Sequence, residues 1–171
     1  MILRLIKLIL STLMLKSYRE QASSWPKSGH HILAQTGDGT VIVYQAFKPC
    51  IAQYAVDNNK FGGPHYSMSR MTWIKTNFLW MMHRSDWGRA INQERVLAIH
   101  VRQEGFHKIL GRAYTGKSQK EEGLQEVDVR LQWDPDHDPY GKKEVRRAIQ
   151  LGIRGETFRE FNNWIVNIED V

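Results

Sequence analysis

The sequence predicts a single α+β domain with a mixed, largely antiparallel sheet. The chain has 171 residues, of which 42% are hydrophobic and 25% charged, and this size and composition fit one ordinary domain. Segments with strand patterns occur beside segments with helical spacing, and the two do not alternate as they do in a repeated βαβ arrangement. We therefore expect about five strands flanked by about four helices within residues 17–171.

The expected strands show two kinds of hydrophobic pattern. Residues 40–47 and 94–102 have nearly continuous apolar runs, which are typical of strands buried on both faces. Residues 127–134 alternate between apolar and polar side chains, as in a strand with one wet face. Residues 145–153 and 164–168 complete the set.

The expected helices lie between these strands. Pro49 suits the first turn of a helix that runs to about residue 59. Further helices are expected over residues 77–87, 106–113 and 155–163, where apolar residues recur at helical spacing. The polar stretch 115–126 is expected to be a flexible loop.

The positive charge of the chain is concentrated at its start. The net charge is +6, and residues 1–16 contribute three cations (Arg4, Lys7 and Lys16) and no acid, so the remainder carries +3. We expect residues 1–16 to lie outside the fold, with an interfacial helix that contacts a membrane surface through residues 1–15, or a targeting peptide, as the alternatives. The apolar run is too short for a transmembrane segment. A lone cysteine fits a reducing, cytoplasmic compartment.

Residues 69–88 are the strongest candidate for a ligand site. Aromatic rings beside cations can stack on a base and bind a phosphate. The candidate ligand-binding residues are Arg70, Trp73, Lys75, Trp80 and Arg84. The same composition also fits a core edge covered by tryptophans with solvated cations around it, so both interpretations stand.

A second candidate is the polar face of the strand over residues 127–134. Arg130, Gln132 and Asp134 project together, and a carboxylate and an amide on a rigid strand can position a polar ligand. We take Asp134 and Gln132 as candidate catalytic residues, because we expect Asp134 and Pro135 to end the strand. The alternative is that the row is simply the solvated face of a sheet.

Two further motifs are set aside on physical grounds. Residues 111–118 match the phosphate-loop pattern G-x-x-x-x-G-K-[ST], but the residues before them look helical, whereas the motif requires a buried strand there. Residues 134–138 carry alternating acids, but a calcium loop would need glycine at Pro139 and glutamate at Val145. No metal site is predicted.

Six phrases in order along the chain resemble a known family. These are WPKSGHHILAQ, VIVYQAFKP, SRMTWIKTNFLWMMHRSDWG, LQWDPDHDP, RRAIQLGIRGE and WIVNIEDV. They resemble the bacterial and fungal family called domain of unknown function 4291, over residues 18–171. The resemblance implies that residues 70–87, 132–135 and 147–150 are family hallmarks, and it brings no established activity.

The order of several features is also loosely similar to that in ADP-ribosyltransferase folds. These features are Tyr44 and Gln45 on an early strand, the segment 69–72 with its hydroxyl side chains, and a late Gln132-x-Asp134. Those enzymes usually place a glutamate where Asp134 stands, and the comparison is at the level of the fold.

These observations favour a nucleotide-directed enzyme, a transferase that acts on a nucleotide or on RNA. The expected ligand is NAD or another nucleotide. The alternatives are a non-catalytic module that binds RNA or a protein through the same surface, and a phosphate-loop nucleotidase acting through residues 111–118.

Overall fold

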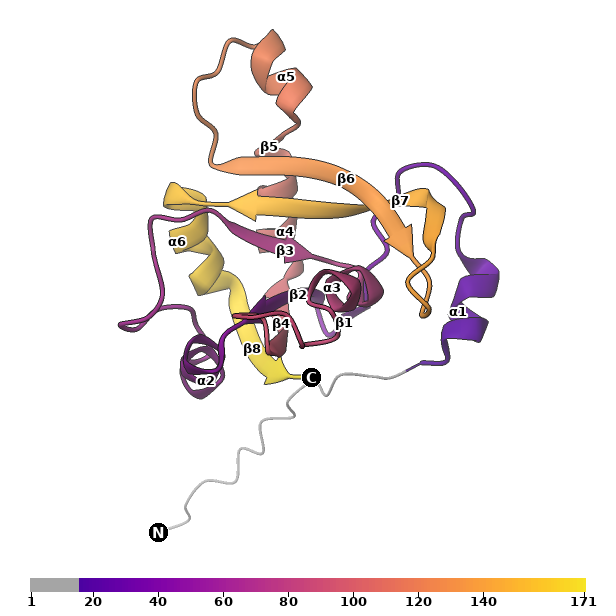
Figure 1. Ribbon diagram of the computed structural model, residues 1–171. Coiled ribbons are helices and arrows are strands. Elements are labelled where there is room, and N and C mark those ends of the chain that lie inside the picture. The colour runs from indigo at the N-terminus through magenta and orange to yellow at the C-terminus, as the bar shows by residue number, and fades with distance from the viewer. Residues whose placement is uncertain (1–15) are drawn as a thin grey trace.

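The computed structural model describes residues 16–171 (Figure 1). The predicted N-terminal extension, and any membrane contact through it, lie outside the described residues apart from Lys16. The strands are β1 (Thr36–Gly37), β2 (Thr40–Phe47), β3 (Thr72–Lys75), β4 (Arg95–Arg102), β5 (Ala113–Tyr114), β6 (Val129–His137), β7 (Lys143–Ile153) and β8 (Ile165–Asp170). The helices are α1 (Tyr18–Ser24), α2 (Pro49–Asn58), α3 (Phe78–Arg84), α4 (Gln103–Gly111), α5 (Gly116–Glu121) and α6 (Gly155–Trp164).

All strands belong to one sheet with the order β5-β6-β7-β3-β2-β4-β8, and β1 pairs with the start of β2. Every pairing is antiparallel except that of β5 with β6. The predicted α+β class and the mixed, mostly antiparallel sheet are therefore confirmed. None of the helices in residues 16–171 has the length and apolarity needed to cross a bilayer.

The predicted numbers of elements are too low. The described part of the chain has eight strands and six helices. The missed strands β1 and β5 have only two residues each, and β3 has four, which is too short for an alternating pattern to stand out. The stretch that we expected to be a loop contains α5, which stands off the sheet with its neighbouring loops (Figure 1).

The predicted end of the alternating strand is also wrong. Strand β6 continues through Pro135 to His137, with a register irregularity between these two residues. Beyond Arg130, β7 is the only strand of the described residues that pairs with β6, because β5 pairs with it at Val129 and Arg130 alone. Proline is tolerated at such an edge, since its nitrogen has no ladder hydrogen bond to donate.

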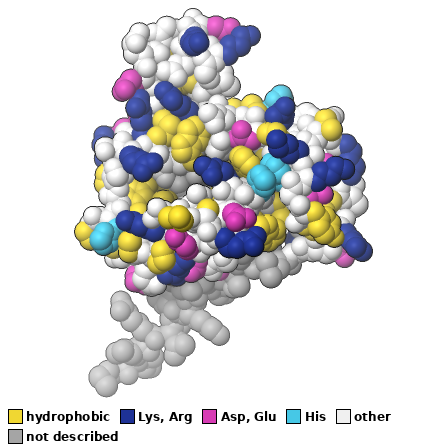
Figure 2. Space-filling model, in the orientation of Figure 1, with side chains coloured by type: hydrophobic (Ala, Val, Ile, Leu, Met, Phe, Trp, Pro, Cys, Tyr) yellow, Lys and Arg dark blue, Asp and Glu magenta, His cyan; other side chains and the backbone are white. Residues whose placement is uncertain are grey.

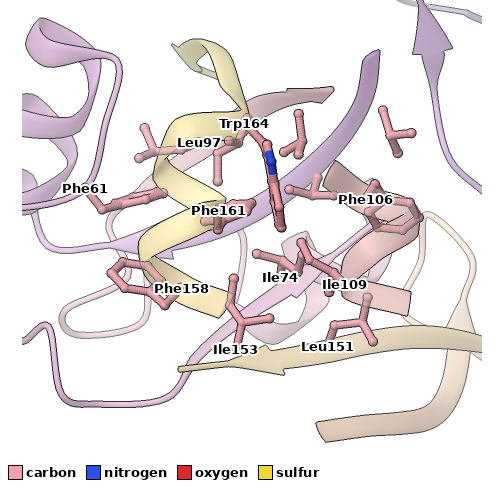
Figure 3. Close-up of a cluster of buried hydrophobic side chains, with 14 of the residues drawn as sticks. Phe61, Ile74, Leu97, Phe106, Ile109, Leu151, Ile153, Phe158, Phe161 and Trp164 are labelled. Carbon is pink, nitrogen blue, oxygen red and sulfur yellow. The ribbon is translucent and has the colours of Figure 1, made fainter. Parts of the chain in front are cut away.

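The main core lies on the face of the sheet that is covered by α2, α4 and α6 (Figure 3). Helix α6 contributes Phe158, Phe161 and Trp164, which are all buried. Its Trp164 packs against Gly105 of α4, where an added Cβ would lie 2.4 Å from the indole. The two helices therefore approach closely only because residue 105 has no side chain.

The opposite face of the sheet is covered in part by the short helix α3. Its Met81 packs on alternate side chains of β2 and β4, in a smaller cluster that contains Ile42, Tyr44, Val96 and Ala98. The same face of β3, β7 and β6 carries polar side chains and lies beyond that cluster. This uncovered part of the sheet is where the candidate site lies.

The sheet divides between β2 and β3. These two strands pair at Tyr44 and Lys75 alone, whereas β2 pairs with β4 along its whole length and β3 pairs with β7 along its own. Residues 45–47 and 72–74 therefore face each other without a backbone ladder. A cleft opens between the two half-sheets at this point.

Candidate functional site

The cleft between β2 and β3 has a volume of about 680 Å³. This volume is within the usual range for small-molecule sites. Its described lining includes four cationic side chains and no Asp or Glu; the cations are Lys48, Arg70, Lys75 and Arg84. Figure 2 shows Lys and Arg side chains on several sides of a hollow near the middle of this face. The cleft is therefore built to attract an anion.

Lys75 is the most deeply buried of these cations, with 5% of its surface exposed. Its ammonium group forms no hydrogen bond or ion pair with any residue of the range 16–171. Burial and the positive charge of Arg84 lower the pKa of Lys75 to about 8, against the opposing effect of Asp134. The cost of burying this positive charge is removed either when an anionic ligand binds beside the amine or when the amine loses its proton.

Helix α3 presents Arg84 to the cleft from its last turn. The helix begins after Asn77, whose side-chain oxygen accepts a hydrogen bond from the Trp80 backbone N–H at 2.9 Å. The amide nitrogen of Asn77 donates to Asp136 Oδ1, also at 2.9 Å. Asp136 thus fixes which way the Asn77 amide points, and the capped helix sets the position of Arg84.

A polar row runs across β3, β7 and β6 beside the cleft. Lys75 pairs with Gln150 of β7, and Gln150 pairs with Gln132 of β6. The Gln150 amide donates to Gln132 Oε1 at 2.8 Å and to Asp134 Oδ2 at 2.6 Å. Gln150 lines the cleft, whereas Gln132 and Asp134 lie outside its lining. The predicted catalytic pair is therefore linked to the cleft through a residue that sequence reasoning did not single out.

Trp73 forms part of the wall of the cleft on the same face. It is half-buried and stands opposite Gly152 in the pairing of β3 with β7. A Cβ at position 152 would lie 2.6 Å from Met71 Sδ and 2.9 Å from two ring carbons of Trp73. The indole therefore lies against the bare backbone of β7, where one ring face can serve a planar ligand.

The sequence places Gln45 on an early strand without marking it as a site residue, and the structure places this buried amide in the lining of the cleft. Its Nε2 donates to Thr72 Oγ1 at 2.5 Å and to the Trp73 carbonyl at 3.0 Å, across the gap between the half-sheets. The Trp73 carbonyl can only accept a hydrogen bond, so the nitrogen of the Gln45 amide must face it. Gln45 Oε1 is therefore buried without a partner among the described residues. The signal was present as one glutamine inside an otherwise apolar strand, TVIVYQAF.

The rim of the cleft opposite β3 is a loop with unusual backbone conformations. Three residues of the loop after α3 have positive φ without being glycine: Asp86 at 50°, Trp87 at 56° and Asn92 at 64°. The same loop carries Ile91, which is 84% exposed and lines the cleft. Backbone strain of this kind gathers at functional sites.

Trp80 is not brought to the cleft with the other candidates. Its ring stacks on His83 and on His137, with ring centroids 5.8 and 5.3 Å apart. Trp80 thus packs α3 against β6. Of the five predicted ligand-binding residues, the structure brings Arg70, Trp73, Lys75 and Arg84 to one concavity.

The phosphate-loop pattern lies elsewhere and lacks its structural setting. Helix α4 runs to Gly111, the first residue of the pattern, where the motif requires a strand, and the helix that follows has six residues. The Lys117 side chain is 85% exposed. In the described part of the chain no group of three or more His, Cys, Asp or Glu side chains could hold a metal ion.

The chain matches the model of a protein family. The family model described as a domain of unknown function (DUF4291) matches residues 31–171. No curated protein matches the chain. The matched region begins before β1 and contains the whole cleft.

Proposed function

The chain belongs to the domain of unknown function 4291 family, and we propose that its cleft is the active site of a nucleotide-directed enzyme. One observation carries the proposal. Lys75 is 5% exposed, and its ammonium group has no protein partner among the described residues, in a cleft whose described lining has four cations and no carboxylate. A buried charge without a partner is costly, and a bound anion removes that cost.

The ligand-binding roles follow from the positions of the side chains. Arg70, Lys75 and Arg84 bind phosphate groups through charge-assisted hydrogen bonds. Trp73 stacks on the base, as aromatic walls do in nucleotide sites. The phosphates thus lie at the junction of the half-sheets, and the base lies over β7.

The reacting group lies on the β6 side of the cleft. Asp134 and Gln132 orient it through Gln150, which contacts both. We propose a transferase that acts on a nucleotide or on RNA. NAD fits the same arrangement, because it combines two phosphates with planar rings.

Nucleotide binding is tested by calorimetric titration with a panel that contains AMP, ATP, NAD and inorganic phosphate. Arg70→Ala and Arg84→Ala should each weaken binding of at least one nucleotide by roughly tenfold or more, since a hydrogen bond to a charged group contributes about 1.5–3 kcal/mol. Arg102→Ala is the matched control. Arg102 is an exposed arginine at the end of β4, outside the cleft, and its loss should leave binding unchanged. If both cleft variants bind the whole panel as well as the parent, the site assignment is wrong.

A second candidate function is a non-catalytic RNA-binding module. The observation that favours it is the exposed Arg130 and Gln132 on the uncovered face of β6, which extend the polar surface beyond the cleft. RNA binding through backbone phosphates weakens steeply as salt rises, because counterions are released. A titration of a short single-stranded RNA at several salt concentrations separates the two functions, and a flat response contradicts the RNA module. Binding of a protein partner through this surface is the remaining alternative, and neither titration should then give a signal.

A further inference from the structure

Phosphate binding alone does not explain why the Lys75 amine lies so deep. A cation beside the ligand is enough to bind a phosphate. The exposed Arg70 supplies such a cation. Lys75 instead stands on β3 at the single residue pair that joins the two half-sheets, between Tyr44 and Gln150. Its side chain is therefore held on a rigid strand, where it can meet one particular atom of a ligand.

The surroundings of Lys75 also favour a reactive amine. A lysine becomes a nucleophile when burial or a neighbouring cation favours loss of its proton. Both act here, since burial and Arg84 lower the pKa of Lys75 to about 8. Asp134 acts on the amine electrostatically without forming an ion pair with it. Gln150 holds Asp134 by Oδ2, which leaves Oδ1 without a protein donor among the described residues and able to accept a proton.

The remaining charges of the cleft indicate the electrophile. In this inference Lys75 is neutral and gives up the phosphate-binding role, which passes to the three remaining cations, Lys48, Arg70 and Arg84; no described carboxylate lines the cleft to offset them. Three cations suit a polyphosphate chain better than a single carboxylate or phosphate. The cleft volume of about 680 Å³ also leaves room for a nucleoside beside the polyphosphate.

We infer that the Lys75 amine is the nucleophile of a nucleotidyl transfer, and that it bonds to the α-phosphorus of a nucleoside triphosphate in the cleft. The inference rests on the proposed function, because the nucleotide must bind here first. The nitrogen lone pair forms an N–P bond, and the bond from the α-phosphorus to the oxygen of the β-phosphate breaks. Pyrophosphate leaves with that electron pair, and the proton of the amine passes to Asp134 and then to solvent. The product is a lysine phosphoramidate that carries a nucleoside monophosphate.

The covalent product is detected by intact-mass spectrometry. The purified protein is incubated with ATP, GTP, CTP or UTP and Mg²⁺. At least one triphosphate should add the mass of one nucleoside monophosphate, release pyrophosphate, and give a bond that acid cleaves and alkali spares. Peptide mapping should place the group on Lys75. The yield should rise from about pH 7 to about pH 9, because the amine loses its proton over this range.

Two variants make the test specific. Lys75→Arg keeps the positive charge but cannot lose its proton, so the adduct should be lost completely while calorimetry still detects nucleotide binding. Lys117→Arg changes an exposed lysine outside the cleft and should keep the full yield. Peptide mapping on the parent decides the matter if Lys75→Arg does not fold.

The possible failures are distinguishable. Nucleotide binding by the parent without any adduct overturns the nucleophile and leaves the proposed function standing. Absence of both binding and adduct overturns both proposals. An adduct that maps to a residue other than Lys75 also overturns the inference.

Discussion

Two cationic side chains are buried near α3, and their surroundings differ. Arg146 of β7 is 3% exposed and donates from Nε to Asp136 Oδ2 at 2.6 Å, where Asp136 is 1% exposed. Its guanidinium also lies over the Trp25 ring at 5.1 Å. Lys75 is buried to a similar degree, at 5%, and has no such partner within residues 16–171. The charge of the paired cation is compensated within the protein, whereas an unpaired buried charge lowers stability, and the proposed anionic ligand would account for its position.

The ion pair of Asp136 with Arg146 also supports the cleft that contains Lys75. Asp136 accepts hydrogen bonds from the Asn77 amide and from the His137 backbone N–H, in addition to Arg146. Asn77 caps α3, and α3 carries Arg84 to the cleft. A buried ion pair at the start of α3 therefore helps to set the position of the cleft cation Arg84 at its end.

The largest expected effect is on stability and comes from removing the Asp136 partner of Arg146. Asp136→Ala leaves the Arg146 charge buried without its partner, so it should lower the free energy of unfolding by about 3–5 kcal/mol. Urea unfolding measured by circular dichroism gives this value. Glu121→Ala removes an exposed acid that pairs with Lys117 at the surface and should change stability by less than about 0.5 kcal/mol. If the Asp136→Ala protein is as stable as the parent, the pair of Asp136 with Arg146 does not support the structure.

The unpaired site should respond in the opposite direction. Lys75→Met removes a buried charge without a partner, so it should raise the free energy of unfolding at neutral pH by up to about 3 kcal/mol, while nucleotide binding falls. Lys117→Met, at an exposed position, should change neither. A Lys75→Met protein that is less stable than the parent would contradict the view that Lys75 lowers stability.

The same residue should give stability a distinct dependence on pH. Between about pH 8 and pH 10.5 the unfolded chain holds a proton on Lys75 that the folded protein has lost. Unfolding therefore takes up a proton, and the free energy of unfolding rises with pH across this window. Above pH 10 the trend should reverse, because burial raises the pKa of Tyr44 and Tyr66 to about 12. Unfolding curves of the parent should show the rise, and those of Lys75→Met should lack it.

The smallest expected effect concerns the wall of the cleft. Gly152→Ala places a methyl group 2.6 Å from Met71 Sδ and 2.9 Å from the Trp73 ring, so the indole must move away from β7. We expect a loss of roughly 1–3 kcal/mol in stability and weaker nucleotide binding. Gly111→Ala is the control, because a Cβ there meets no atom within 4 Å. If Gly152→Ala binds nucleotides like the parent, Trp73 does not form the base-binding wall.

The sequence by itself determined the fold class and pointed to four of the residues that line the cleft. Long strands such as β2 and β4 are evident because their apolar runs reflect burial on both faces. Arg70, Trp73, Lys75 and Arg84 could be found because they are close together in sequence and combine aromatic with cationic chemistry. The family was also identified from short phrases, and the family model confirms it over residues 31–171.

The tertiary structure decided which of these residues meet, and what state they are in. The division of the sheet between β2 and β3 depends on pairing partners far apart in the chain, such as Tyr44 and Lys75, and no local pattern encodes it. Gln45 and Gln150 line the cleft for the same reason. Trp80 lies outside it, because α3 directs its ring toward His137. Above all, the burial of Lys75 arises from packing between distant segments, and burial is what turns an ordinary lysine into the defining residue of the cleft.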